Sequence, residues 1–356
     1  MINLNKKNIQ ILDCTLRDGG LALQDLHLNN EAYDPIENKN SFKVMDALSD
    51  AGIDMIEVGS IDPEVKKPND FFIYKDIQSL SKTIPSQRDS AIYVGLFRGP
   101  DTDLKSIPDY DESLCQHVRV IIRYSELQKS IDFCAGLANK GYKVFIQPMV
   151  TMRYDASELC QLIDSANQMN AYAMYLVDSY GYMNHQDIDG LFLLYDQKLD
   201  PSIRIGLHAH NNMNLAFSNT QHFMNRKTPR QMIVDSTISG MGQGAGNMQT
   251  ELLVPYMNEY FNCAYNLESI LKASEIIEPL AKFGRWGYSI TNLLPAIHKT
   301  AYKFSLDFRR NFKLNYSQIN FLLSNIPEEF RHRYTKENAK QLLELFAKEV
   351  KERIDK

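Results

Sequence analysis

Two histidines stand close together at the end of an apolar segment, RIGLHAH (204–210). Alternate residues of a β-strand point to the same side, so His208 and His210 can bind one cation together. Two imidazoles and a carboxylate such as Asp18 suit Mn²⁺, Zn²⁺, Co²⁺ or Fe²⁺, whereas additional oxygen ligands would favour Mg²⁺. A His-x-His pair by itself is weak evidence for a metal site, and its position at a predicted strand end strengthens the prediction.

A second segment, ILDCTLRDGG (11–20), places a cation and an anion side by side where another predicted strand ends. Arg17 and Asp18 can serve a charged ligand and a metal ion together at this position. Gly19 and Gly20 follow them, and glycine lets the backbone turn sharply or lets another group come close. We therefore predict that these two glycines contribute to substrate binding.

A third segment, STISGMGQGAGNM (236–248), has four glycines within seven residues, 240–246. Such a loop can approach another group closely or offer backbone N–H groups to an anion. It can equally be a flexible connector. The segment lacks the GxGxxG spacing of dinucleotide sites, and no GxxxxGK[ST] phosphate loop occurs in the chain.

The chain alternates short apolar runs with segments of helical spacing. Eight runs are rich in β-branched or aromatic residues, as strands covered on both faces should be: 9–14, 53–59, 91–97, 117–123, 142–148, 172–178, 204–210 and 232–237. Helices are predicted between them, for example over 41–52, 125–141 and 156–171, and ELLVPYMNEYFN (251–262) supplies an eighth. These units span about 260 residues, which predicts an α/β fold of the (β/α)₈ TIM-barrel type. A doubly wound sheet is the structural alternative.

The remaining residues contain no comparable strand. The segments 267–283, 292–308 and 338–354 all have helical spacing, which predicts a C-terminal helical extension. We therefore expect a barrel domain over residues 1–264 and a helical domain over residues 265–356.

Composition limits the class of protein. The net charge of −5 argues against binding to nucleic acid or to an anionic membrane. The five cysteines are scattered without CxxC spacing, which suits a reducing compartment. No apolar run approaches the ~18 residues that span a bilayer, and the first residues lack the apolar core of a signal peptide. We therefore expect a cytoplasmic protein.

In a TIM barrel, catalytic residues collect at the carboxyl ends of the strands. The predicted strands end in the following charged or hydrogen-bonding residues: Arg17, Asp18, Glu57, Arg98, Arg123, Gln147, Asp178, Ser179, His208, His210 and Asp235. Packing alone does not explain this pattern, because buried charges cost several kcal/mol unless they are paired or bind a metal.

Three of these strand ends leave two interpretations open. Arg98 and Arg123 can contact a carboxylate or phosphate of the substrate, since guanidinium groups bind such anions through two parallel hydrogen bonds. Each can instead belong to a structural ion pair. Glu57 can take part in the chemistry, or it can be a buried partner that orients Arg17.

Three motifs in this order resemble those of a known superfamily. DCTLRDGG after the first predicted strand, HAHNN at the seventh and SGMGQGAGN after the eighth resemble the DRE-TIM metallolyases. The likeness covers residues 8–262 and is greatest to the pyruvate aldolases of the 4-hydroxy-2-oxovalerate aldolase type. It implies a TIM barrel that makes or breaks a carbon–carbon bond with a divalent metal ion, for which Mn²⁺ is expected and Mg²⁺, Co²⁺ and Zn²⁺ are alternatives.

The resemblance also implies roles for individual residues. Asp18, His208 and His210 match the metal ligands, and Asn247 aligns with an asparagine on or near the metal. Arg17 resembles the arginine that stabilises the enolate oxygen.

Two further matches concern the substrate. Ser179, in VDSYG, resembles the serine that contacts the substrate carboxylate. Tyr288, in WGYSITNLL, matches a tyrosine near the substrate.

Two departures from the family pattern stand beside these matches. Leu21 occupies the position at which the aldolases carry the histidine implicated as general base, so a metal-bound hydroxide, Tyr288 or a residue elsewhere would have to serve. The condensing synthases usually carry RDGEQ, whereas this chain has RDGG, which favours aldolase chemistry over acyl-CoA chemistry.

The predicted function is a carbon–carbon lyase that cleaves a 4-hydroxy-2-oxo acid to pyruvate and an aldehyde, or runs the reverse condensation, through a pyruvate enolate held at the metal. An acyl-CoA lyase or a Claisen-condensing synthase is the alternative enzyme, and a barrel that serves as a scaffold for a dehydrogenase is the third possibility. A lysine Schiff base is disfavoured because no predicted strand ends in lysine. The resemblance further implies a homo-oligomer, expected to be a dimer, and an aldehyde dehydrogenase partner.

Overall fold

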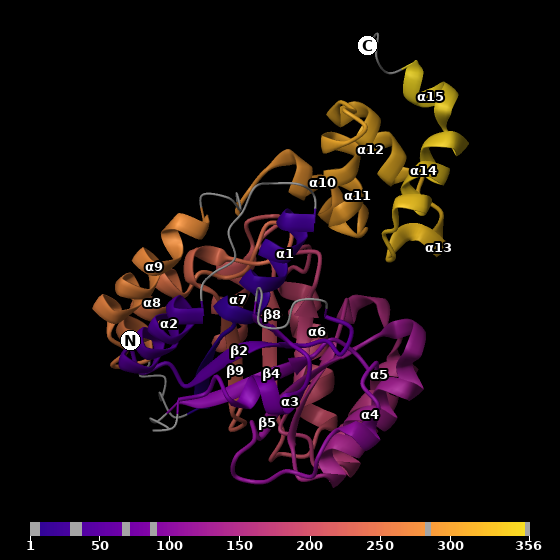
Figure 1. Cartoon of the computed structure of the whole chain (residues 1–356). Helices are drawn as coiled ribbons and strands as arrows, with labels where there is room; N and C mark the ends of the chain where they lie inside the picture. Colours follow the sequence, from indigo (N-terminus) through magenta and orange to yellow (C-terminus); the bar gives the residue numbers. More distant parts are fainter. Residues whose placement is uncertain (1–7, 29–37, 66–71, 86–90, 282–285, 353–356) are drawn as a thin grey trace.

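The computed structural model describes residues 8–28, 38–65, 72–85, 91–281 and 286–352. Eight parallel strands form a closed barrel (Figure 1). In chain order they are β1 (Ile9–Asp13), β2 (Met55–Ile61), β4 (Ile92–Phe97), β5 (His117–Ile122), β6 (Lys143–Pro148), β7 (Ala173–Asp178), β8 (Arg204–Ala209) and β9 (Met232–Ser236). Neighbours in this order pair with each other, and β1 pairs with both β2 and β9. The closure confirms the TIM barrel and excludes the open doubly wound sheet.

The strands form where they were predicted, because each is an apolar run buried on both sides. Every residue of β2, β7 and β9 is buried. Inside the barrel, side chains such as Met55, Val94, Phe145 and Tyr175 form an apolar cluster. One short strand, β3 (Ile73–Tyr74), pairs with the last two residues of β2, Ser60 and Ile61, and was not predicted.

Helices surround the barrel between successive strands (Figure 1). They are α1 (Gly20–Leu28), α2 (Asn38–Asp50), α3 (Ile77–Ser81), α4 (Leu127–Asn139), α5 (Ala156–Gln168), α6 (His185–Lys198), α7 (Ala216–Met224) and α8 (Thr250–Tyr260). Clear start signals define some of them: Asp155 and Glu158 form a capping box at the start of α5, as Asn184 and Asp187 do for α6. The predicted helices at 41–52, 125–141 and 156–171 are confirmed: the first begins earlier, at Asn38, and the other two are shorter than predicted.

Further helices follow the barrel: α9 (Leu267–Ala281), α10 (Ile290–His298), α11 (Tyr302–Arg310), α12 (Tyr316–Ser324), α13 (Glu328–Arg331), α14 (Lys336–Leu345) and α15 (Ala347–Lys351). Helix α9 lies against α2, and its buried residues belong to the barrel's core. Helices α10–α15 enclose a core of their own, which includes Phe304, Phe308 and Leu322. The division of the chain at residue 264 stays a prediction.

Two segments that have continuous helical spacing are each interrupted. Residues 292–308 form α10 and α11, because Lys299 adopts a left-handed conformation with φ of 54° and ends α10. Residues 338–352 form α14 and α15, which meet at Phe346. The first interruption has a consequence for the site, because the start of α11 then lines a cavity at the mouth of the barrel.

Within the described ranges, no helix combines the length and the apolar character needed to cross a membrane.

Candidate active site

A single turn of π-helix, Thr15–Gly19, connects β1 to α1 and carries Arg17 and Asp18. Such turns are rare and occur frequently at functional sites. All five residues of the turn are buried. A Cβ atom at Gly19 would lie 2.9 Å from Cε of Met241, so glycine permits the turn to approach the loop after β9. The turn thereby brings Asp18 to the mouth of the barrel.

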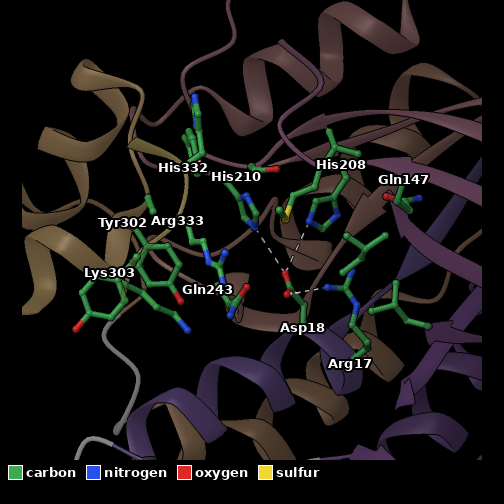
Figure 2. Close-up of a pocket in the computed structure, with 18 residues that line it drawn as sticks. Arg17, Asp18, Gln147, His208, His210, Gln243, Tyr302, Lys303, His332 and Arg333 are labelled. Carbon is green, nitrogen blue, oxygen red and sulfur yellow. Dashed lines mark hydrogen bonds and ion pairs between the residues drawn. The ribbon is translucent and has the colours of Figure 1, made fainter. Parts of the chain in front are cut away.

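Asp18, His208 and His210 meet at one point (Figure 2). Nε2 of His208 and Nε2 of His210 each lie 3.8 Å from Oδ2 of Asp18, and the three ligand atoms all lie within 4.8 Å of one another. Two ligands of one ion, at bond lengths of about 2.1 Å, lie at most about 4.2 Å apart. The two distances to Asp18 therefore suit a shared divalent cation.

The hydrogen bonds of the two imidazoles leave both Nε2 atoms free to bind a metal. Nδ1 of His208 donates to Oδ2 of Asp235 at 2.8 Å, and Nδ1 of His210 donates to the carbonyl oxygen of Asp178 at 3.1 Å. A carboxylate and a carbonyl only accept, so the proton of each ring lies on Nδ1 and the lone pair on Nε2. Nε2 of His210 is buried and has no hydrogen-bond partner among the described residues. Metal-binding histidines are typically oriented in this way.

Burial and neighbouring charges set the protonation of these groups. Burial lowers the pKa of His208 to about 4 even though Asp235 raises it, so the ring is neutral at neutral pH. Burial alone would raise the pKa of Asp18, but Arg17 and the two histidines hold it well below its usual value. The carboxylate of Asp18 is therefore ionised and can bind a cation.

Asn247 lies beside Asp18. Its Nδ2 donates to Oδ2 of Asp18 at 2.5 Å and to the carbonyl of Met241 at 2.9 Å, while its Oδ1 is buried without a partner among the described residues. A half-turn of the amide exchanges the two atoms and would turn Oδ1 toward Asp18. A Cβ atom at Gly242 would lie 2.2 Å from Nδ2 of Asn247, which explains a glycine in the loop at this position.

Arg17 is held between two carboxylates. Its Nη1 donates to Oδ1 of Asp18 and its Nε donates to Oε2 of Glu57, both at 2.8 Å. Glu57 is completely buried and lies behind Arg17, outside the set of residues that line the cavity described below. This placement matches the interpretation of Glu57 as the group that orients Arg17.

Sequence reasoning missed Arg119, which extends this network through the inside of the barrel. Its Nη1 donates to Oε2 of Glu57 at 2.9 Å and its Nη2 donates to Oδ2 of Asp235 at 2.5 Å. The side chain is completely buried. Charged contacts therefore run without interruption from Asp18 through Arg17, Glu57 and Arg119 to Asp235, which holds His208. An arginine in the middle of an apolar strand was the available signal, because such a cation must be paired.

A cavity of about 340 Å³ lies over these groups. Its barrel wall brings together six of the predicted site residues, Arg17, Asp18, Gln147, Ser179, His208 and His210, and also includes Gln243. Its helical wall consists of residues 301–303 and 332–334, at the start of α11 and between α13 and α14. Sequence reasoning did not predict the helical wall. Figure 2 shows Tyr302, Lys303 and Arg333 on one side of Asp18, and Arg17 and Gln147 on the other.

Arg98 and Arg123 lie outside this cavity. Together they line a smaller pocket, where Arg98 pairs with Asp62 at 2.9 Å and Arg123 pairs with Asp101. The structure thus places both arginines in ion pairs, which was the alternative left open for them.

Tyr288 is also absent from the described residues that line the cavity. It lies two residues before α10 and is 57% exposed. The tyrosines that do line the cavity are Tyr180, Tyr302 and Tyr334. Gly20 begins α1, directly after the π-helical turn.

Comparison with known proteins agrees with this geometry. The profile of the HMGL-like family matches residues 8–277. The chain belongs to the HMGL-like family. It is 26% identical to a 4-hydroxy-2-oxovalerate aldolase of Geobacillus genomosp. 3, over 77% of this chain and 78% of that protein.

Two solved structures of similar fold can be set beside the chain. The N-terminal domain of a candidate aldolase from Bacteroides vulgatus has a TM-score of 0.70 and 22% identity, covering 85% of this chain and 98% of that one. A hydroxymethylglutaryl-CoA lyase from Pseudomonas aeruginosa has a TM-score of 0.59 and 19% identity, covering 78% of this chain and 94% of that one.

Proteins of the HMGL-like family depend on a divalent metal ion, and the residues present here suit one. Two imidazole lone pairs and an ionised carboxylate surround one point, and the amide of Asn247 lies beside it with an unpartnered Oδ1 that a half-turn would direct there. Leu21 is buried in the apolar core and contributes no proton acceptor.

Proposed function

We propose that this protein is a divalent-metal-dependent aldolase that cleaves a 4-hydroxy-2-oxo acid to pyruvate and an aldehyde, or condenses the two. The observation that carries the proposal is the meeting of Asp18, His208 and His210 beside Arg17 in a cavity at the mouth of the barrel. The printed name of the relative from Geobacillus genomosp. 3 supports the aldolase class, as does the name of the Bacteroides vulgatus structure. Small-molecule 2-oxo acids are accordingly the expected substrates.

Asp18 and the two histidines would hold the metal ion, with Asn247 as an additional oxygen donor. Mn²⁺ is the first metal to test, because nitrogen and oxygen ligands together suit it. When bound, a divalent cation acts as a Lewis acid that stabilises negative charge on a substrate oxygen.

Arg17 adds a fixed positive charge beside this point. Cleaving or forming a carbon–carbon bond next to a keto group passes through an enolate, and a cation already in place stabilises the negative charge that develops on its oxygen. Glu57 and Asp18 hold the guanidinium at 2.8 Å on two sides, so little reorganisation is needed during the reaction. Loss of one such preorganised group typically costs about 10²–10³ in rate.

Two further side chains of the barrel wall have hydrogen-bond donors available for a substrate carboxylate. Nε2 of Gln147 is buried and has no partner among the described residues. Oγ of Ser179 accepts a hydrogen bond from the N–H of Val150 at 2.8 Å, so its hydroxyl hydrogen can point into the cavity. Together these donors are suited to orienting the carboxylate of pyruvate.

A lysine is present in the cavity after all, on the helical wall. Lys303 does not lie at a strand end, and its Nζ forms an ion pair with Oδ1 of Asp25 at 2.9 Å. A Schiff base needs a lysine whose amine can attack the substrate carbonyl, whereas this Nζ is engaged by a carboxylate. The proposal therefore does not use a Schiff base.

Three measurements test the proposed function together. The protein, with Mn²⁺ and pyruvate, is incubated with a panel of aldehydes, and 4-hydroxy-2-oxo acids are identified by mass spectrometry. In D₂O, the methyl protons of pyruvate should exchange in the presence of protein and Mn²⁺ without any thioester. Borohydride added to protein and pyruvate should give no covalent adduct.

The alternatives predict other outcomes. An acyl-CoA enzyme would require a thioester for exchange, and a lysine-dependent aldolase would form the adduct. Absence of both product and exchange with every divalent metal would refute the proposal.

The cytoplasmic location stays a prediction from composition, and a dimeric state and an aldehyde dehydrogenase partner stay predictions from the resemblance.

A further inference from the structure

The charges that line the cavity are unevenly compensated. Among the described lining residues, three are arginine or lysine (Arg17, Lys303 and Arg333) and one, Asp18, is acidic. Arg17 is paired with Asp18 and Glu57, and Lys303 is paired with Asp25. Arg333 is exposed, and its guanidinium has neither an ion pair nor a hydrogen bond in the described part of the chain, so only water solvates it when no ligand is bound. A guanidinium on a cavity wall with its donors unused is suited to binding an oxyanion through two parallel hydrogen bonds.

The backbone that carries Arg333 is fixed on both sides. The ring of His332 stacks on Tyr180 with centroids 5.8 Å apart and planes at 3°, and its Nδ1 lies 3.2 Å from the hydroxyl of Tyr180. Nδ2 of Asn338 donates to the carbonyl of Arg333 at 2.9 Å. His332 therefore ties the segment to the loop after β7, while Asn338 ties it to α14. The backbone at Arg333 is thereby anchored on each side, and its side chain lines the cavity.

The positive charge of Lys303 is compensated by the carboxylate of Asp25. This carboxylate accepts hydrogen bonds from Gln243 at 3.0 Å, Tyr302 at 2.7 Å and Lys303 at 2.9 Å. It is thus engaged by three donors, and it does not line the cavity itself. Its charge anchors α11 to α1 and compensates Lys303.

The two cationic ends of the cavity lie on opposite sides of the candidate metal site. Figure 2 shows Arg333 and Lys303 on one side of Asp18, with Arg17 and Gln147 on the other. A substrate whose 2-oxo acid group lies near Arg17 and Gln147 would extend its other end toward Arg333. A neutral aliphatic end would leave that guanidinium unpaired, whereas a carboxylate or phosphate would form an ion pair with it.

We propose that the aldehyde half of the substrate carries an anionic group, a carboxylate or a phosphate, which Arg333 binds with Lys303 beside it on the helical wall. This inference rests on the proposed function and deepens it by naming the class of aldehyde. It gives the helical wall the task of selecting the substrate, while the barrel wall supplies the chemistry.

Matched pairs of aldehydes test the proposal. Succinic semialdehyde is compared with butanal, and glyceraldehyde 3-phosphate with glyceraldehyde, each in condensation with pyruvate and Mn²⁺. For at least one pair, kcat/KM should be about tenfold or more higher for the charged aldehyde, which is the scale of one hydrogen-bonded charge. The pair with the larger ratio distinguishes carboxylate from phosphate recognition.

The variant Arg333→Met should bring that ratio close to one, and Arg333→Glu should bring it below one. Both rates of a ratio come from the same sample, so incomplete folding of a variant cancels. Arg309→Met is the control, because Arg309 is an exposed arginine of the same helices that does not line the cavity. It should keep the ratio of the unchanged protein.

The outcomes separate the two proposals. If neutral aldehydes react and charged ones react no faster, anion recognition is overturned and the aldolase function stands. A charged preference that survives Arg333→Glu overturns the assignment to Arg333. If no aldehyde of either kind reacts, the aldolase function fails, and the anion site as an aldehyde site fails with it.

Discussion

The barrel wall and the helical wall of the cavity hold their charges in different ways. On the barrel wall each charged group contacts an oppositely charged one, and the network from Asp18 to Asp235 passes through Arg119, which no solvent reaches. On the helical wall, Lys303 is partly exposed and Arg333 has no carboxylate partner in the described part of the chain. A wall whose charges are buried and paired is suited to holding one geometry, whereas an exposed cation without a partner is solvated by water and can exchange that water for an anionic ligand.

The formal charges of the network that includes and supports the barrel wall sharpen this contrast. Asp18, Glu57 and Asp235 contribute three negative charges, and Arg17 and Arg119 contribute two positive ones, so the network has a net formal charge of −1. A divalent cation would change the sum to +1 and make the site attractive to a carboxylate substrate. The barrel wall therefore attracts an anion only when the metal is bound, whereas Arg333 on the helical wall attracts one without it.

The largest effect is expected from the metal ligands. Asp18→Ala removes the acid that both histidines face, so bound metal should be lost and the rate should fall by about 10³-fold or more. Metal content by elemental analysis and aldol activity measure both consequences. His222→Ala is the control, because His222 also bonds a carboxylate, Asp189 at 2.7 Å, but does not line the cavity. An Asp18→Ala protein with full metal content and full activity would contradict the assignment.

The buried arginine of the barrel wall should matter more for stability than its exposed neighbour. Arg119→Met leaves Glu57 and Asp235 buried without their cation, which should lower the free energy of unfolding by about 3–5 kcal/mol. Arg123→Met, just after the same strand, removes a partly exposed pair with Asp101 and should cost less than about 1 kcal/mol. Urea denaturation compares the two variants, and Arg119→Lys replaces Arg119→Met if the latter does not fold. Equal losses would mean that the network is not a stabilising feature of the barrel wall.

A smaller effect is expected where the network reaches the metal site. Asp235→Asn keeps the shape of the side chain but removes the charge that orients His208 and pairs with Arg119. Affinity for Mn²⁺ should fall by about 10–100-fold, as for other groups that orient a metal-binding histidine. Titration calorimetry measures this directly. Asp196→Asn is the control, because Asp196 pairs with Arg230 away from the cavity. Unchanged Mn²⁺ affinity in Asp235→Asn would show that the orientation of His208 does not depend on that charge.

The barrel wall was largely predictable because a repeated pattern places it. Parallel strands of a barrel end on the same side, so Asp18 and the histidine pair, nearly two hundred residues apart in the chain, could be expected to meet. The alternation of side chains could not be seen in strands that are apolar on both faces, and Arg123 was chosen at the strand end while Arg119 lies in the network.

The helical wall could not be predicted in the same way. Which helix covers the barrel depends on the break at Lys299 and on the contacts of Asp25 with Tyr302 and Lys303, and helical spacing reveals neither. Tyr288 was chosen by resemblance to a motif, whereas the structure brings Tyr302 to the cavity.

The hydrogen bond from Tyr302 to Asp25 allows the stability of the helical wall to be tested independently of that of the barrel. Tyr302→Phe removes one of the donors to Asp25, a loss of about 1 kcal/mol or slightly more. Hydrogen exchange should become faster in α11 and α14, while β1, β8 and β9 keep their protection. The control Tyr316→Phe changes a tyrosine of α12 that does not line the cavity. Faster exchange in the strands as well would show that the two walls unfold as one unit, and substrate selection on one wall could then not vary without disturbing the chemistry on the other.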